Sequence, residues 1–289
     1  MPDQAILREA YKETKNACRT GWAAQSTGDA ILRLATLSLK FLEKEGEFID
    51  LVSRVPGKEY VSYRRNGIVA RPANRNLFMR DVEEMERHWK AWEQGVISDS
   101  RLSRMSYTVA LAPSLAMELF DRQNKKGPAT YFECLIGHIF ARAFHKEPTK
   151  KVSLPLHGRA VRMTMDFLFN LGQGKANIHL PVKMSTRERV VQAWAHQRLL
   201  DSGFGTGSYK GIMVLFSETK MDSRSLEVVE ICVPDQWLAY QSLLAQMDKI
   251  FYFDVPDRYK SLTESFPNVI EISQFGEFFN QIGSIEAKS

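Results

Sequence analysis

Two charged residues in the middle of the chain each follow a segment typical of a strand. Asp166 comes directly after residues 161–165, and Lys183 comes directly after residues 178–182. Carboxylate oxygens are the ligands that Mg²⁺ prefers, and a lysine beside a phosphate can stabilise charge that develops during hydrolysis. Each residue alone is an ordinary strand end, either a turn former or a solvated charge. Together they predict metal-assisted cleavage of a phosphodiester bond, if neighbouring strands bring them to one edge of a sheet.

Three consecutive charged residues, Arg187, Glu188 and Arg189, follow shortly after Lys183. An arginine can pair bidentately with guanine, and a glutamate can accept a hydrogen bond from the cytosine amino group. The triplet therefore predicts that base pairs are recognised from the major groove, close to the residues that would cut the backbone.

The triplet opens a segment, 186–201, that has the periodicity of an amphipathic helix. Ser185 or Thr186 is expected to cap this helix. Its expected buried stripe consists of Val190, Val191, Trp194 and Leu199. A second face carries Arg189, Gln192 and His196 at helical spacing, and either looks toward DNA or is simply solvated.

Composition narrows the possible classes of protein. The 289 residues carry a net charge of +5, which favours a polyanionic partner only modestly. No apolar run reaches the ~20 residues that span a bilayer, and the first residues lack the features of a secretory signal. Three widely spaced cysteines predict neither a disulfide framework nor a zinc site. We therefore expect a cytoplasmic protein that does not bind membranes.

Helical and strand patterns alternate along the chain and predict a mixed α/β fold. The expected division is a mainly helical region at 1–120 and a core at 121–289. Helices are expected at 3–22, at 28–45 with Asp29 as N-cap, and at 80–95, 130–144, 186–201 and 235–247. Strands are expected at 152–156, 159–171, 176–182, 211–216, 227–233 and 249–253. Residues 55–71 are expected to form a loop or short strands, residues 99–100 to cap a short helix or turn, and the chain after Pro256 to be a short terminal region.

These residues together resemble a known family. Asp166, the Val-Lys that ends at Lys183, and the Lys-x-Ser-x-Arg-Glu-Arg at 183–189 are similar to type II restriction endonucleases of the PD-(D/E)XK superfamily. The similarity is to the branch that recognises CCGG, CCNGG and CCWGG sites, and it covers residues 120–216. It implies a restriction-endonuclease-like core, with a central mixed β-sheet flanked by helices, and an N-terminal helical region for dimerisation and DNA enclosure.

The resemblance also implies a catalytic and metal-binding set. Asp166 and Lys183 match the family's catalytic pair, and Glu133 matches the glutamate of its N-terminal catalytic helix. The acid that usually lies two residues before the lysine is replaced by Pro181, and in this branch it commonly moves into the following helix. His196 stands at that position with Gln197 next to it. The expected metal ligands are therefore Asp166 and Glu133, with His196 or Gln197 in the place of the missing acid.

The resemblance implies Mg²⁺-dependent cleavage of double-stranded DNA at a palindromic site with a CC…GG core. Arg187, Glu188 and Arg189 would read the CC:GG step, and Gln123, Asn124 and Lys125 would contact DNA near the minor groove. A palindrome implies a homodimer, or a higher oligomer, and a restriction-modification system in a prokaryotic cytoplasm implies a cognate DNA methyltransferase.

Two other interpretations remain open. The missing acid is compatible with a catalytically degenerate, sequence-specific DNA-binding protein. The same fold also hosts structure-selective repair nucleases that do not read sequence.

Overall fold

The computed structural model describes residues 2–95, 99–121, 123–124, 126–185 and 190–287. Within these ranges, no helix has both the length and the apolar content needed to cross a membrane. The chain divides into two compact units, one formed by residues 1–138 and 219–231 and the other by residues 139–218 and 232–289. The units therefore do not follow the expected division between residues 120 and 121.

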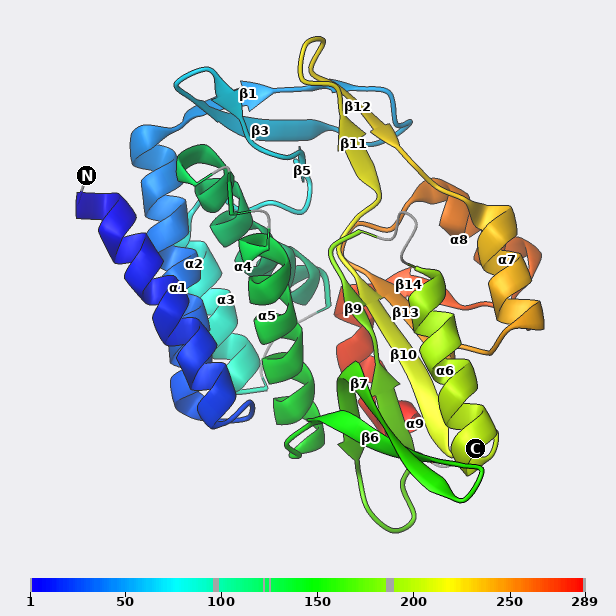
Figure 1. The fold of residues 1–289 in the computed structure, drawn as a ribbon. Coiled ribbons are helices and arrows are strands. Elements are labelled where there is room, and N and C mark those ends of the chain that lie inside the picture. Colours follow the sequence, from blue (N-terminus) through cyan, green and yellow to red (C-terminus); the bar gives the residue numbers. More distant parts are fainter. Residues whose placement is uncertain (1, 96–98, 122, 125, 186–189, 288–289) are drawn as a thin grey trace. The chain divides into compact units, whose positions relative to one another are not determined.

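The first unit is built on helices that are held together by apolar faces (Figure 1). They are α1 (Pro2–Thr20), α2 (Gln25–Glu45), α3 (Val82–Glu93), α4 (Asp99–Phe120) and the first part of α5 (Gly127–Phe144). The expected helices at 3–22, 28–45, 80–95 and 130–144 are all present. The expectation that Asp29 caps the second helix is wrong, because α2 begins four residues earlier at Gln25 and Ala24 is its N-cap.

Helix α4 is much longer than the short helix or turn expected after residue 99. Nearly every residue from Met105 to Met117 is buried, including Ser106, Thr108 and Ser114. A helix that is buried on all sides shows no amphipathic period, which is the signal that sequence patterns provide. Pro113, inside the helix, weakens the pattern further.

The first unit also holds two small sheets. One contains β1 (Glu47–Asp50), β3 (Tyr60–Arg65), β4 (Ile68–Val69) and β5 (Ala73–Asn74). The other contains β2 (Val52–Ser53), β11 (Thr219–Met221) and β12 (Glu227–Glu230). The strand expected at 227–233 therefore ends at Glu230 and, by pairing with β2 and β11, belongs to the first unit.

The second unit is organised by a seven-stranded mixed sheet with the order β14-β13-β10-β8-β7-β6, in which β9 also pairs with β10. The strands are β6 (Thr149–Leu156), β7 (Arg159–Asn170), β8 (Asn177–Leu180), β9 (Val182–Lys183), β10 (Tyr209–Leu215), β13 (Lys249–Tyr252) and β14 (Ile272–Gln274). Strands β8, β9 and β13 run parallel to β10, whereas β7 runs antiparallel to both β6 and β8. The expected central mixed sheet is confirmed.

Helices cover both faces of this sheet. They are α6 (Val191–Phe204), α7 (Pro234–Leu243), α8 (Asp257–Ser265), the 3₁₀ helix η2 (Phe275–Glu277) and α9 (Phe278–Glu286). On one face, Trp194 of α6 and Trp237 of α7 pack with Met213 and Leu215 of β10. Phe278 of α9 stacks on Phe140 at a ring-centroid distance of 4.2 Å. The region after Pro256 is thus an integral part of the core and not the short terminal region expected.

Helix α6 differs from the helix expected at 186–201. It begins at Val191 after Val190, which makes no side-chain cap hydrogen bond, and the residues that a cap at Ser185 would contact lie outside the described residues. Thr186 lies outside the described residues. Val191 and Leu199 are exposed rather than buried, and the buried residues of the helix are Ala193, Trp194, Gln197 and Leu200. The buried positions 193, 197 and 200 recur at spacings of four and three, and Val191 and Leu199 lie off this stripe.

Candidate active site

The structure brings Asp166 and Lys183 together. Asp166 lies on β7 and Lys183 ends β9, and the Lys183 Nζ atom donates to Asp166 Oδ2 at 2.6 Å. The backbone N–H of Val182 donates to the same oxygen at 2.9 Å. The Asp166 side chain is 24% exposed and the Lys183 side chain is 21% exposed, so both charges remain within reach of an incoming ligand. The expectation that these two residues meet at the sheet is confirmed.

Pro181 shapes the chain between the two strands that lead to Lys183. Strand β8 ends at Leu180 and β9 begins at Val182, and both pair with β10. A proline has no N–H to donate, but its carbonyl oxygen accepts from the N–H of Val214 at 2.9 Å, which keeps the chain on β10. The interruption therefore leaves the ladder with β10 intact and directs the next N–H, that of Val182, to Asp166.

The ion pair is suited to phosphate chemistry. A lysine ammonium has three N–H donors, and the contact with Asp166 uses one of them. The remaining donors can bind a phosphate oxygen or a water molecule. No described residue bonds to the second carboxylate oxygen of Asp166, which leaves a hard oxygen ligand available.

A buried hydrogen-bond network lies on the α6 side of this pair. The Gln197 Nε2 atom donates to Asp201 Oδ1 at 3.0 Å and to the Tyr209 carbonyl at 2.9 Å. Two acceptors on Nε2 fix the orientation of the amide, so Gln197 Oε1 must accept from His179 Nδ1, which lies 3.0 Å away. His179 therefore carries its proton on Nδ1, and its Nε2 is an acceptor to which no described group bonds.

Burial favours the neutral form of both histidines near the pair. Burial lowers the pKa of His179 to about 4, although its hydrogen bond with Gln197 acts in the opposite direction. The pKa of His196 is also lowered, mainly by desolvation. The Lys183 charge adds to this lowering, and the Asp166 charge opposes it. The ring centroids of the two histidines are 6.3 Å apart. His196 thus lies within the electrostatic field of the Asp166–Lys183 pair.

The two residues considered for the place of the missing acid have different surroundings. Gln197 is 2% exposed, and both of its polar atoms are engaged in the network just described. His196 is partly exposed and interacts electrostatically with Asp166 and Lys183. Of the two, His196 is the side chain that remains available to a metal-bound water or a metal.

Glu133 is placed in the first unit. It lies in α5, where its charge contributes to raising the pKa of Tyr11 on α1, an effect that is due mainly to burial of that tyrosine. Tyr11 also donates to the Gly127 carbonyl at the start of α5. A role for Glu133 as a metal ligand beside Asp166 stays a prediction, because the two residues belong to different units.

The expected DNA-contacting residues are only partly described. Arg187, Glu188, Arg189 and Lys125 lie outside the described residues. Gln123 is exposed. Asn124 holds the start of α5, because its Oδ1 accepts from the Gly127 N–H at 3.0 Å.

Of the ligands that a divalent cation needs, Asp166 supplies one carboxylate. Mg²⁺ is commonly held by one or two carboxylates and completes its shell with waters and substrate phosphates. Within the described part of the chain, no group of three or more His, Cys, Asp and Glu side chains is arranged to hold a metal ion. The donors present therefore suit a cation that is held by Asp166 and shared with substrate, rather than one enclosed by protein.

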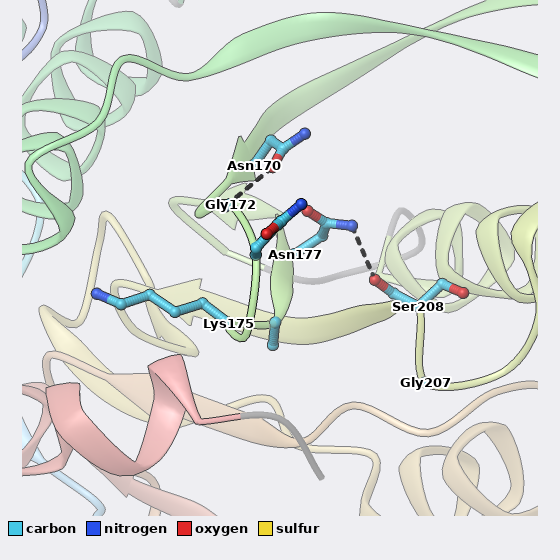
Figure 2. Close-up of a pocket in the computed structure, with 8 residues that line it drawn as sticks. Asn170, Gly172, Lys175, Asn177, Gly207 and Ser208 are labelled. Carbon is cyan, nitrogen blue, oxygen red and sulfur yellow. Dashed lines mark hydrogen bonds between the residues drawn. The ribbon is translucent and has the colours of Figure 1, made fainter.

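A hollow of about 510 Å³ lies at the end of the central strands opposite the Asp166–Lys183 pair (Figure 2). Its lining comes from the β7–β8 turn and the loop before β10, and includes Asn170, Lys175, Asn177 and Ser208. Lys175 pairs with Glu286 at 2.9 Å, and the Asn177 side chain donates to the Ser208 carbonyl at 3.2 Å. These contacts stabilise the loops and offer no group suited to catalysis.

Comparison with known proteins gives the fold a precedent. No family model and no curated protein match the chain. The chain is similar to the crystal structure of the type IIP restriction endonuclease Kpn2I, with a TM-score of 0.81 and 23% identity over 96% of this chain and 97% of that chain. A complex of the restriction endonuclease PspGI with substrate DNA gives a TM-score of 0.44 and 14% identity over 70% of this chain and 91% of that one. The first likeness confirms the expected restriction-endonuclease fold.

His179 and Gln197 form a part of the site that sequence patterns did not identify as a unit. His179 stands between Ile178 and Leu180 in a buried strand, and a polar residue in such a run is a signal of a satisfied hydrogen bond. Its partner could not be inferred, because Gln197 reaches it only when α6 packs over β8 and β10.

Burial of His179 predicts a stability that depends on pH. Its pKa is near 6.5 in an unfolded chain and about 4 in the folded protein, so its contribution is full above pH 6.5. The free energy of unfolding should fall by roughly 3 kcal/mol from this group as pH drops from 6.5 toward 4. His179→Asn cannot titrate but keeps an N–H donor toward Gln197. Urea unfolding at a series of pH values should show the stability gap between wild type and variant narrowing as pH falls. Parallel loss of stability in both proteins would contradict the burial of a neutral His179.

Proposed function

We propose that this chain is a Mg²⁺-dependent type II restriction endonuclease that hydrolyses double-stranded DNA at a palindromic site with a CC…GG core. The observation that carries the proposal is the 2.6 Å contact between Lys183 Nζ and Asp166 Oδ2, at the interrupted strand end of the central sheet. A partly exposed carboxylate–ammonium pair can bind both a cation and a phosphate. The fold, which is that of the Kpn2I structure, supports the same activity.

Each residue of the pair has a distinct role in the proposed reaction. Asp166 holds Mg²⁺, which supplies Lewis-acid chemistry when bound. Lys183 donates to the scissile phosphate and stabilises the negative charge that builds on it. The Val182 N–H and the Lys183 ammonium orient the Asp166 carboxylate, so that its second oxygen faces the ligand. His196 hydrogen-bonds water near Asp166 in place of the missing acid, and Glu133 assists in metal binding.

Sequence reading is assigned to Arg187, Glu188 and Arg189, which would contact a CC:GG step from the major groove. Their residue types and their position between Lys183 and α6 support this assignment. Gln123, Asn124 and Lys125 are proposed to contact DNA near the start of α5. A palindromic site needs two copies of each reading element, so the active form is proposed to be a homodimer or a higher oligomer. A prokaryotic cytoplasm and a cognate methyltransferase complete the proposal.

Two observations favour a second candidate, a degenerate sequence-specific DNA-binding protein. Pro181 occupies the position of the usual second acid, and the described residues hold no three-residue metal cluster. In that case the chain would bind its site without cutting it. The retained Asp166–Lys183 contact favours the active enzyme, because reading base pairs does not require it.

Removal of either charge of the pair should separate cutting from binding. Asp166→Asn keeps an acceptor for the Val182 N–H but loses the carboxylate charge, and Lys183→Met keeps the chain length but loses the ammonium. We expect each variant to cleave DNA at least roughly 100-fold more slowly, because transition-state charge is no longer stabilised. Single-turnover cleavage and equilibrium binding to the same duplex would be measured, and site-specific binding should change by less than about tenfold (~1.4 kcal/mol). Wild-type cleavage rates in both variants would exclude this pair as the catalytic centre.

Loss of the central glutamate of the triplet should have the opposite effect. Glu188→Ala removes an acceptor for a cytosine amino group and should weaken binding to the specific site by ~1–3 kcal/mol. Binding to unrelated duplexes should be unchanged, because the residue does not contact phosphates in this account. Equal affinity of variant and wild type for the specific site would show that Glu188 does not read a base.

A further inference from the structure

Strands β6 and β7 form a two-stranded ribbon at one edge of the seven-stranded sheet (Figure 1). They are joined by His157 and Gly158, whose φ values of 47° and 73° are those of a type I′ hairpin turn. From Pro155 to Val161, every residue of the ribbon is exposed. The tip of the ribbon is therefore available to a partner.

The ribbon has an unusual charge distribution. Residues 149–165 contain Lys150, Lys151, Arg159 and Arg162 but no aspartate or glutamate. The whole chain has 34 acidic residues against 39 basic ones, so the ribbon departs from the nearly balanced charge of the rest. A segment with one sign of charge attracts a partner of the opposite sign.

The two faces of the ribbon differ in what they contact. Val152 lies opposite Met163 and Leu154 opposite Val161, and Leu154 packs with Leu200 of α6. The apolar side chains thus anchor the ribbon to the helix. Because side chains alternate along a strand, the neighbouring pairs project from the other face. Those pairs are Lys151 with Thr164 and Ser153 with Arg162, and all four residues are exposed.

Three of the ribbon's four Lys and Arg residues have no acidic partner among the described residues. Within the described ranges, no carboxylate forms an ion pair with Lys151, Arg159 or Arg162. Lys150 contacts the face of the Phe167 ring, at 4.4 Å from its centroid. Lys151 and Arg162 are diagonal neighbours on one face, so two exposed positive charges and two hydroxyl groups lie together. Closely spaced donors of this kind match the phosphates of a nucleic-acid backbone.

We propose that the β6–β7 ribbon is an arm that binds the phosphate backbone of duplex DNA beyond the bond that is cut. The inference rests on the proposed function, because it extends from Asp166 along the same strand. Arg162 precedes Asp166 by four residues on β7, so alternation places both side chains on one face of the strand.

An arm of this kind adds affinity without adding sequence selectivity, because phosphates are the same at every base pair. Each lysine or arginine that neutralises a phosphate makes binding more dependent on salt, with a slope of about −0.9 per contact in a plot of log affinity against log salt. The arm and the triplet at 187–189 would therefore act on different properties of the same complex.

The test is the double variant K151Q/R162Q of the full chain, compared with wild type on duplexes of one sequence and graded flank length. We expect weaker binding to specific and unrelated duplexes by the same factor, and a salt slope that is smaller by about 1.8. The difference from wild type should decrease as the flank is shortened and vanish on a duplex too short to reach the arm, which then has no phosphate to contact. The substituted side chains are exposed, and thermal unfolding would confirm that the fold is retained.

The matched control is K220Q/R224Q, which removes the same charge from exposed positions on the β11–β12 hairpin. That hairpin also carries Asp222, Glu227 and Glu230, so it has no excess of positive charge, and the control should bind DNA with the wild-type salt slope.

Three outcomes would contradict the proposal that the β6–β7 ribbon binds the DNA backbone. If wild type binds and cuts DNA while K151Q/R162Q binds equally well with the same slope, the arm is wrong and the proposed function stands. If K151Q/R162Q changes the oligomeric state in sedimentation and leaves the slope unchanged, the ribbon contacts a second copy of the chain instead. If wild type neither binds nor cuts duplex DNA at low salt, the arm and the proposed function both fail.

Discussion

The contact between the Lys183 ammonium and the Asp166 carboxylate is the interaction on which the candidate active site depends. Each side chain is less than one-quarter exposed, so removal of one would leave the other charge poorly solvated and unpaired. The contact forms only because β7 pairs with β8 while β9 continues along β10 after Pro181. A local sequence motif therefore becomes a site only through the order of strands in the sheet.

A second layer of polar groups stabilises the surroundings of this contact. Gln197 links α6 to β8 through His179 and to the start of β10 through the Tyr209 carbonyl. At Gly211, an added Cβ would lie 2.9 Å from Gln197 Oε1 and 2.6 Å from Met247 Sδ, so the close approach of the amide requires glycine. Both polar atoms of the Gln197 amide have partners. His179 uses Nδ1 to bond to Gln197, so its Nε2 lies on the other side of the ring and has no described partner. Rigid packing around a partly exposed ion pair is the arrangement that electrostatic catalysis needs.

Much of this arrangement could be predicted from the sequence, and the failures have physical causes. The strands that carry Asp166 and Lys183 were predictable, since alternation and turn residues are local signals, although β7 continues past Asp166 to Asn170. Helix α4 was not, because burial on all sides removes the amphipathic period. The buried face of α6 was assigned incorrectly at Val191 and Leu199, because the buried stripe runs through the polar Gln197, whose partners exist only after folding. The link between His179 and Gln197 joins segments whose contact exists only after folding.

The central claim is that this chain cuts DNA at one palindromic sequence. The most direct measurement is incubation of the full chain with phage and plasmid DNA, with and without Mg²⁺, followed by sequencing of every fragment end. The account predicts discrete fragments that depend on Mg²⁺, with all ends at a single palindrome that contains CC and GG. Ends scattered over unrelated sequences would contradict sequence reading, and selective binding without any cleavage would contradict catalysis at Asp166 and Lys183.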